Sequence, residues 1–363
     1  MPLQNNQLSR MIINGYKSIR SEDISFGKIN VLIGSNGAGK SNFISAFSFL
    51  QDILSKNLQV SVAKSGVNAL LYNGRKVTHE ISFEFFFGQN SYGFCLVPTD
   101  DGRLIFQKEY FRYFGNQKEE VLIGQGNSES QCDSSAVSSL WPDVTSVLES
   151  QNWRVYHFHD TGRSARVKQE HNISNNRVLL YDAGNLAAFL YRLRNSWRSN
   201  YDDIVRTIQL IAPFFSDFVL EPREGNDEQI ILRWQQKGCE DIFNASQLSD
   251  GTLRFICLAV LLLQPCELQP ATIIIDEPEL GLHPYAITIF AEMVRQISDR
   301  KQIIISTQSV ELLDEFEAGD VIVADRDVNG SKFKRLNEDE LRLWLDEDYA
   351  LGELWKKNIL IKP

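Results

Sequence analysis

The most constraining feature of this sequence is the segment GSNGAGKS at residues 34–41, which matches the pattern GxxxxGK[ST] in full. The β-branched stretch Ile29–Ile33 precedes it, and apolar residues recur at helical spacing from Ser41 to Leu54. In this strand–loop–helix context, glycines let backbone N–H groups approach a phosphate, and the helix N-terminus adds a positive dipole. A glycine-rich turn without function is the alternative, and both flanks argue against it. We predict that a nucleotide binds the following residues: Gly34, Ser35, Asn36, Gly37, Ala38, Gly39, Lys40 and Ser41.

A pair of carboxylates follows a second apolar strand. The segment ATIIIDEPELGLHP places Ile273–Ile275 immediately before Asp276 and Glu277. The carboxyl end of a buried strand lies at the ligand-binding edge of an α/β sheet. In a nucleotide site, Lys40 would contact the β- and γ-phosphates, Ser41 and Asp276 would ligate Mg²⁺, and Glu277 would orient or deprotonate the attacking water. An exposed acidic turn after a core strand is the alternative.

A third motif, LSDGTLR, opens an apolar segment that reaches Leu263. Ser249 can cap a helix there, and Gly251 leaves a backbone amide uncovered, which together make an anion site at a helix N-terminus. A capping role alone is the alternative for Ser249.

Composition limits the class of protein. Hydrophobic residues make up 43% of the chain, enough for a globular core, and the net charge is −10, so no global field attracts nucleic acid or anionic lipid. The five cysteines form no CxxC pair, which argues against a zinc ribbon or a disulfide framework. We find no signal peptide and no apolar run of the length that spans a bilayer. We therefore expect a soluble, cytoplasmic protein.

The order of predicted elements indicates an α/β protein with a β-rich insertion. Strands near Met11–Tyr16 and Ile29–Ile33 flank a polar connection, and residues 79–123 read as an antiparallel meander of aromatic-rich strands. A serine-rich segment at 124–145 reads as a surface loop, two helices should follow Asp182, and residues 218–238 resemble a β-hairpin with its turn near 224–226. The last third alternates helix and strand, as in a parallel sheet. We expect three segments: 1–180, 181–247 and 248–363.

With these motifs, the sequence resembles the ATP-binding cassette superfamily. GYKSIRSEDISFGKINVLIGSNGAGKSN, LSDGTLR and DEPELGLHP are similar to the RecF/SMC-related branch, and within it to stand-alone predicted ATPases and OLD-type ATPases. The resemblance implies a P-loop NTPase cassette of the RecF-like type, with an antiparallel β subdomain and a small helical lobe. It implies a Mg²⁺-dependent ATPase that dimerises head-to-tail around two ATP molecules, with Ser249 and Gly251 of one protomer acting on the γ-phosphate bound by the other.

The sequence departs from the family at the switch position. The residue after IIIST, a histidine in relatives, is Gln308, which can hydrogen-bond the γ-phosphate or water but carries no charge. His283 is the nearby histidine, with loop packing as its alternative role. Gln89 and Gln107 are weak candidates for the glutamine that follows the meander in relatives. Lys17 and Arg20 lie where relatives often place a basic residue near the phosphates, or they are exposed strand charges.

Four weaker features have simpler interpretations. The basic, aromatic segment 154–168 could contact a nucleic-acid backbone, but a solvated loop or a partner-docking face is favoured. His157 and His159 alternate on one strand face without a third metal ligand in the sequence nearby. Asp325 and Asp327 resemble the DxD of a TOPRIM nuclease, but a strand running into a turn is favoured. The segment 344–358 reads as an amphipathic tail that packs on the core or docks a partner.

Two alternatives to a working ATPase stay open at this point. By the resemblance, such ATPases drive a separately encoded effector, such as a nuclease or toxin, in anti-phage defence or DNA maintenance. A scaffold that binds nucleotide without hydrolysing it is the first alternative, because of Gln308. The nucleotide-binding subunit of a transporter is the second, and LSDGTLR and the GYKSIR opening argue against it. Nucleic acid is a possible partner, and we expect no membrane partner.

Overall fold

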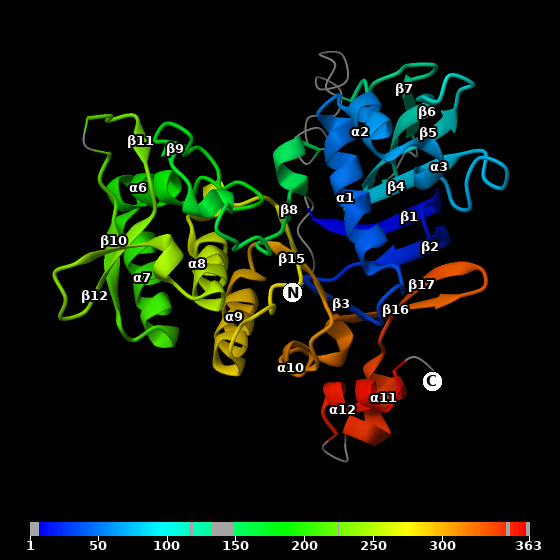
Figure 1. Cartoon of the computed structure of the whole chain (residues 1–363). Helices are drawn as coiled ribbons and strands as arrows, with labels where there is room; N and C mark the ends of the chain where they lie inside the picture. Colours follow the sequence, from blue (N-terminus) through cyan, green and yellow to red (C-terminus); the bar gives the residue numbers. More distant parts are fainter. Residues whose placement is uncertain (1–6, 116–118, 133–147, 224, 346–348, 361–363) are drawn as a thin grey trace. The chain divides into compact units, whose positions relative to one another are not determined.

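The computed structural model describes residues 7–115, 119–132, 148–223, 225–345 and 349–360 (Figure 1). Two compact units are present, and each is described by itself. Unit 1 comprises Met1–Val155, Ala271–Ile274 and Lys301–Pro363, and unit 2 comprises Tyr156–Pro270 and Ile275–Arg300. The three segments expected from the sequence divide the chain on a different basis and stay a prediction. Among the described residues, no helix is both long and apolar enough to cross a membrane.

Unit 1 contains a six-stranded antiparallel sheet that includes the predicted meander. Its first hairpin was not expected: residues 19–25, which we interpreted as a polar connection, form a strand paired with β1. The pattern was misleading because this is an edge strand, in which Ile19 and Ile24 alone are buried. In pairing order the strands are β2 (Ile19–Ser25), β1 (Leu8–Tyr16), β4 (Ile81–Phe87), β5 (Asn90–Pro98), β6 (Leu104–Tyr113) and β7 (Glu119–Gly124).

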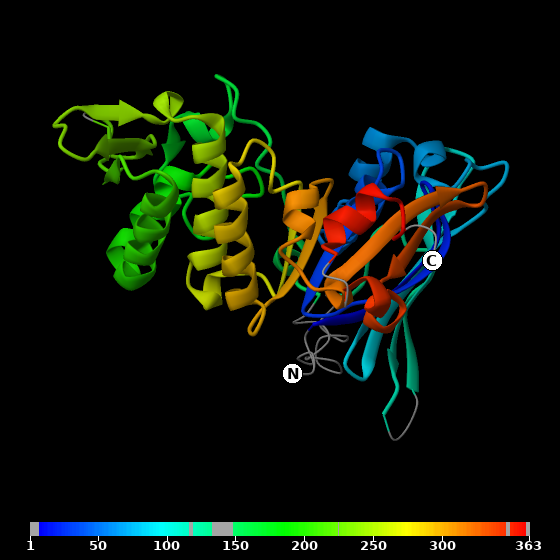
Figure 2. The ribbon, with the colours of Figure 1, turned by 90° about the horizontal axis from the view of Figure 1, so that it is seen from below.

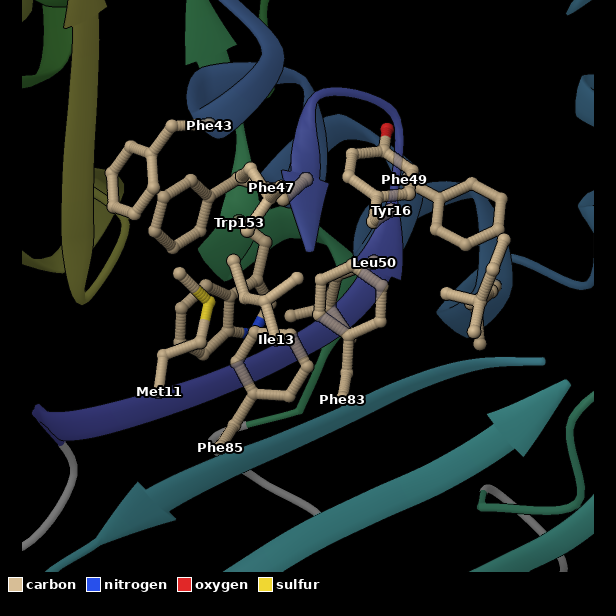
Figure 3. Close-up of a cluster of buried hydrophobic side chains, with 14 of the residues drawn as sticks. Met11, Ile13, Tyr16, Phe43, Phe47, Phe49, Leu50, Phe83, Phe85 and Trp153 are labelled. Atoms are coloured by element: carbon tan, nitrogen blue, oxygen red, sulfur yellow. The ribbon is translucent and has the colours of Figure 1, made fainter. Parts of the chain in front are cut away.

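A dense aromatic core lies between this sheet and the helix that follows the phosphate loop. Phe47 of that helix stacks on Trp153 with ring centroids 6.2 Å apart, and Trp153 lies 5.6 Å from Phe87. Figure 3 shows Met11 and Phe85 packed beneath Phe47 and Trp153. Full burial of such a side chain contributes about 1.5–3 kcal/mol. The helix and its first turn are therefore fixed by the sheet.

A second sheet of unit 1 carries the phosphate loop. Strand β3 pairs in parallel with β15 on one side and β16 on the other, and all six of its residues are buried. Burial on both faces explains its continuous apolar sequence. The chain passes from unit 1 to unit 2 within β14. In pairing order the strands are β17 (Gly330–Arg335), β16 (Val321–Asp327), β3 (Ile29–Gly34), β15 (Gln302–Thr307), β14 (Thr272–Asp276) and β8 (Val155–Tyr156).

Helices complete unit 1. The expected helix from 41 to 54 is present and begins one residue earlier. Asp325 and Asp327 lie on β16, which turns into β17 as we favoured over a nuclease motif (Figure 2). Of the serine-rich segment, residues 133–145 lie outside the described residues. The helical elements are α1 (Lys40–Leu54), α2 (Leu58–Ser65), α3 (Val67–Leu70), η1 (Ser150–Trp153), α10 (Val310–Leu313), η5 (Ala318–Asp320), α11 (Glu338–Leu345) and α12 (Leu351–Lys356).

Unit 2 is mainly helical, and α8 and α9 lie side by side in both views (Figures 1 and 2). The two helices expected after Asp182 are present. The helical elements are α6 (Leu186–Ser196), α7 (Arg198–Ile211), α8 (Asp250–Leu263), α9 (Pro284–Ile297), η2 (Arg166–Lys168), η3 (Ala245–Gln247) and η4 (Cys266–Leu268).

The single hairpin predicted for residues 218–238 is too simple. Its outer strands do pair in antiparallel fashion, but the residues between them include a short strand that pairs with a distant segment instead. An isolated bridge joins Arg223 to Asn226, at the predicted turn. The strands are β10 (Phe215–Val219), β12 (Arg233–Gln236) and β13 (Ile242–Asn244) in one sheet, and β9 (His171–Asn172) with β11 (Gln229–Ile230) in another.

Candidate active site

The phosphate loop has the predicted strand–loop–helix context, since β3 ends at Gly34 and α1 begins at Lys40. Gly39 occupies the N-cap position with φ of 110°, in the left-handed region. A Cβ atom there would lie 2.1 Å from Oγ of Ser331, so both backbone conformation and space require glycine. Because glycine has no side chain to cap the helix, the first N–H groups of α1 are available to an external anion.

Lys40 is the buried cation of this loop. The residue is only 5% exposed, and its Nζ donates to the carbonyl oxygens of Gly34 at 2.6 Å and Ser35 at 3.2 Å. Around it, Ser35, Asn36 and Gly37 are exposed, and so is Ser41, the first-turn hydroxyl. An exposed amide loop wrapped around a buried ammonium group fits a polyphosphate, and the exposed hydroxyl fits an oxygen ligand of Mg²⁺.

Gln308 and the phosphate loop both follow the carboxyl ends of strands in the second sheet. In the parallel register, Thr307 of β15 pairs with Ile33 of β3, so Gln308 and Gly34 follow neighbouring strand ends. Gln308 is exposed. The structure thus places Gln308 beside the start of the phosphate loop, and its role there stays a prediction.

Hydroxyl and amide side chains surround the base of the loop. Ser18 Oγ lies 2.7 Å from Ser331 Oγ and accepts from Nδ2 of Asn42 at 2.7 Å. Lys17 donates to Oγ of Ser45 on α1, and burial lowers the pKa of its ammonium group. Arg20 is exposed and contacts Asn329 instead. These bonds tie the β1–β2 turn to the first turns of α1.

The acidic strand end lies in unit 2. Asp276 ends β14, and Glu277 follows with φ of 46°, a left-handed conformation that is uncommon for a residue with a Cβ atom. His157 Nδ1 is 3.5 Å from Oδ2 of Asp276, and His159 Nε2 is 2.9 Å from the carbonyl oxygen of Asp276. Burial lowers the pKa of His157, although the nearby carboxylate of Asp276 opposes that shift.

From the sequence we favoured no metal site at these two histidines, and the structure places both of them beside Asp276. Their alternate spacing indicated a shared face, but the residue they share that face with is more than 100 positions away along the chain. The described residues hold no group of three or more His, Cys, Asp or Glu side chains suited to a metal ion. Both histidines therefore belong with the acidic strand end: His159 hydrogen-bonds the main chain of Asp276, and His157 faces its carboxylate.

The LSDGTLR motif begins α8 as expected. Oγ of Ser249 accepts from the N–H of Thr252 at 3.1 Å, so the capping role is present. Gly251 packs against the loop after Glu277, where a Cβ atom would lie 2.2 Å from the carbonyl oxygen of Gly281. Ser249 and Asp250 are exposed, and Asp250 lies 3.7 Å from Lys168.

Arg254, the last residue of that motif, joins three segments of unit 2. Its guanidinium donates to the carbonyl oxygens of Phe158 at 3.2 Å, His159 at 2.9 Å and Leu280 at 2.8 Å. Arg254 thereby joins α8 to the segment that contains His157 and His159 and to the loop that follows Glu277.

Comparison with known proteins identifies the family. Residues 29–314 match the family described as "AAA domain, putative AbiEii toxin, Type IV TA system". The chain belongs to this family. Its matched region contains the phosphate loop, the LSDGTLR motif at the start of α8, the acidic strand end and Gln308.

Relatives of this AAA-domain protein agree with that membership. The "Old nuclease" of Escherichia phage P2 is 22% identical over 367 residues, covering 90% of this chain and 60% of the relative. The SmcHead bound to the C-winged helix domain of ScpA matches with a TM-score of 0.56 at 16% identity, covering 93% of this chain and 99% of that one. The Smc head domain with an extended coiled coil, bound to the C-terminal domain of ScpA derived from Pyrococcus furiosus, matches with a TM-score of 0.54 at 15% identity, covering 94% and 98%.

The resemblance and the fold class predicted from the sequence are confirmed. The protein is a RecF/SMC-like AAA ATPase with a P-loop NTPase fold of the ABC/RecF-like type. At these low identities the SMC heads establish the fold alone.

The remaining candidate residues of this AAA-domain protein have local structural partners. His283 caps α9, accepting from the N–H of Tyr285. Gln89 accepts from the hydroxyl of Tyr113, and Gln107 from the thiol of Cys95. In the basic segment, Arg166 pairs with Asp182 at 2.9 Å.

Proposed function

We propose that this AAA ATPase binds ATP with Mg²⁺, hydrolyses it, and dimerises head-to-tail around two nucleotides to control a separately encoded effector. The observation that carries the proposal is the phosphate loop, in which a buried Lys40 lies under exposed amides at the start of α1. A buried ammonium group that donates to two loop carbonyls is placed to exchange them for phosphate oxygens.

Within one protomer we assign five roles. Lys40 donates to the β- and γ-phosphates, and the amides of residues 34–41 surround the phosphate oxygens. Ser41 and Asp276 would hold Mg²⁺, which when bound neutralises charge on the phosphates. Glu277 accepts a proton from the attacking water or orients it, and Gln308 hydrogen-bonds the γ-phosphate or that water.

The partner protomer would complete each site. Ser249 is exposed at the N-terminus of α8, two residues before the half-buried Gly251. Such a helix end attracts an anion, and one protomer's phosphate loop leaves the γ-phosphate open on one side. Binding of ATP would therefore favour the dimer by mass action, because the nucleotide contributes contacts to both protomers.

We place the effector in another polypeptide. The relative from phage P2 is named a nuclease, and the chain spans 60% of its length, which supports a nuclease as the effector class. A nuclease or toxin acting in anti-phage defence or DNA maintenance is the proposed effector class. A pull-down of the native protein followed by mass spectrometry tests this part, and recovery of no stoichiometric partner would count against it.

ATP turnover tests the enzymatic part. The wild type should release phosphate from ATP, whereas Glu277→Gln should bind ATP and turn over about 10²–10⁴-fold more slowly, since an amide cannot accept the proton. Glu292→Gln, an exposed position on α9, is the matched control and should behave as wild type. Turnover of Glu277→Gln within twofold of wild type would contradict the assignment of Glu277.

One observation favours a second function. Gln308 occupies the switch position without a titratable group, which suits a scaffold that binds nucleotide and does not hydrolyse it. In that case ATP would assemble the complex while the wild type released no phosphate. A transporter subunit is the weaker alternative, and copurification with membranes would support it.

A further inference from the structure

Glu277 has an uncommon backbone conformation, and the proposed chemistry requires its side chain to be placed accurately against the attacking water. Its φ of 46° lies in the left-handed region, where a Cβ atom crowds the following carbonyl. A conformation of this kind persists only where surrounding contacts hold it, and strained residues of this type cluster at functional sites. The contact that holds the peptide between Asp276 and Glu277 is therefore of interest.

His159 makes that contact. Its Nε2 is 2.9 Å from the carbonyl oxygen of Asp276. A carbonyl oxygen only accepts, so Nε2 carries the hydrogen and donates it. This carbonyl belongs to the peptide plane that leads into Glu277, so the bond fixes one end of the φ rotation that places the Glu277 side chain.

His159 is itself held from behind. Nη2 of Arg254 donates to the carbonyl oxygen of His159 at 2.9 Å, and Nε of Arg254 to that of Phe158 at 3.2 Å. Phe158, His159, Arg254 and Glu277 share the lining of a cavity of only about 10 Å³, so the group is closely packed. The main chain that carries the imidazole is thus anchored to Arg254.

His157 differs from His159 in what it faces. Nδ1 of His157 lies 3.5 Å from the carboxylate of Asp276, whereas His159 contacts the main chain. Removal of the two rings should therefore have separable effects, one on a side chain and one on the peptide before Glu277.

We propose that His159 is a positioning residue: it holds the Asp276–Glu277 peptide in its left-handed geometry so that Glu277 meets the attacking water. The inference rests on the proposed function, in which Glu277 acts on that water. It predicts that loss of His159 weakens the transition state and leaves ground-state nucleotide binding intact, because the contact acts through Glu277.

The test compares His159→Ala with His159→Gln, whose Nε2 can donate to the same carbonyl. In the alanine variant, kcat and the affinity for ADP with aluminium fluoride should each fall about 10- to 100-fold, as a displaced catalytic group produces. KM and the affinity for a non-hydrolysable ATP analogue should stay within twofold. The glutamine variant should recover most of the loss, and His79→Ala, an exposed histidine of unit 1, should match wild type.

A double-mutant cycle with Glu277→Gln separates positioning from general damage. If His159 acts through Glu277, adding His159→Ala to Glu277→Gln should cause no further loss of residual turnover. Additive losses, equal weakening of the ATP analogue, or failure of glutamine to rescue would each overturn the inference. If Lys40→Ala and Glu277→Gln behave as proposed but His159→Ala matches wild type, the inference alone fails. A wild type without turnover would overturn the proposed function and this inference together.

Discussion

At the scale of single residues, Lys40 has the clearest assignment, because its buried ammonium group lies among the carbonyl oxygens of the phosphate loop. Desolvating an ammonium group is costly unless charged or polar oxygens surround it, and here two loop carbonyls do so. A polyphosphate would replace neutral acceptors with anionic ones, which make stronger bonds.

Lys40→Ala should therefore weaken ATP binding by about 1.5–3 kcal/mol, the usual value of a hydrogen bond to a charged group, or roughly 10- to 100-fold in Kd. Isothermal titration calorimetry with a non-hydrolysable analogue measures this. Lys64→Ala, an exposed lysine of the same unit, is the control and should bind as wild type. Unchanged affinity in Lys40→Ala would remove the phosphate-loop assignment.

Asp320 gives a prediction about pH and stability. Burial, with the charge of Glu317 adding to it, raises the pKa of this carboxyl from its ordinary value to about 6. A raised pKa means that folding favours the protonated form, so the stabilising contribution is complete below pH 4 and is lost as pH rises to about 6. Asp320→Asn should thus raise the free energy of unfolding at pH 7–8 by about 1–3 kcal/mol.

Urea unfolding at several pH values checks that expectation. The difference between Asp320→Asn and wild type should shrink toward zero as pH falls below about 4, where the wild-type carboxyl is protonated in both states. Asp227→Asn, at an exposed position, is the control. A difference that is constant with pH would show that titration of Asp320 is not its cause.

At the scale of elements, the start of α8 depends on Arg254 more than on its own cap. The Ser249 cap contributes about 1 kcal/mol, whereas Arg254 makes hydrogen bonds to three carbonyl oxygens of two other segments. We expect Arg254→Ala to lower the free energy of unfolding of unit 2 by about 1–3 kcal/mol, since it leaves two part-buried carbonyls without this donor.

Hydrogen exchange tests this prediction segment by segment. Amides of residues 157–161 and 279–282 should exchange faster in Arg254→Ala, and Arg254→Lys should protect them only in part, because an ammonium group cannot span the same carbonyls. Arg206→Ala, whose side chain is 69% exposed on α7, should leave exchange unchanged. Equal protection from hydrogen exchange in Arg254→Ala and wild type would contradict the proposal that Arg254 holds these segments.

Periodicity predicted the elements that are buried on a regular face and missed those that are not. Strands β3 and β15 are buried throughout and helices α1 and α8 are buried along a face, and the apolar residues in their sequences indicate it. Strand β2 is an edge strand with few buried residues, so its pattern is weak. The contacts of His157, His159 and Arg254 with distant main-chain atoms leave no local pattern, because the partners are set by tertiary packing.

At the scale of the whole molecule, the motifs predicted the P-loop NTPase fold correctly, because chemistry fixes the spacing of a phosphate loop more tightly than packing fixes a helix end. The head-to-tail dimer stays a proposal, and mixing two inactive variants examines it. Ser249→Arg keeps an intact Lys40, and Lys40→Ala keeps an intact Ser249, so a mixed dimer should contain one complete composite site and regain part of the turnover.

That complementation needs proof that mixed dimers form. Tagged variants purified as a pair provide it, and each variant alone is the control and should show little turnover. Full wild-type turnover by Ser249→Arg alone would be incompatible with a signature motif that acts across the interface.

The central claim, that ATP joins two protomers, is tested most directly by the molar mass of Glu277→Gln with and without ATP and Mg²⁺. Light scattering should give the mass of one 41.5 kDa chain without nucleotide and twice that mass with ATP, because binding is retained and slow hydrolysis preserves the closed state. The same protein with ADP should remain at the lower mass. A mass of one chain in ATP, at a concentration where calorimetry shows the nucleotide to be bound, would contradict the account.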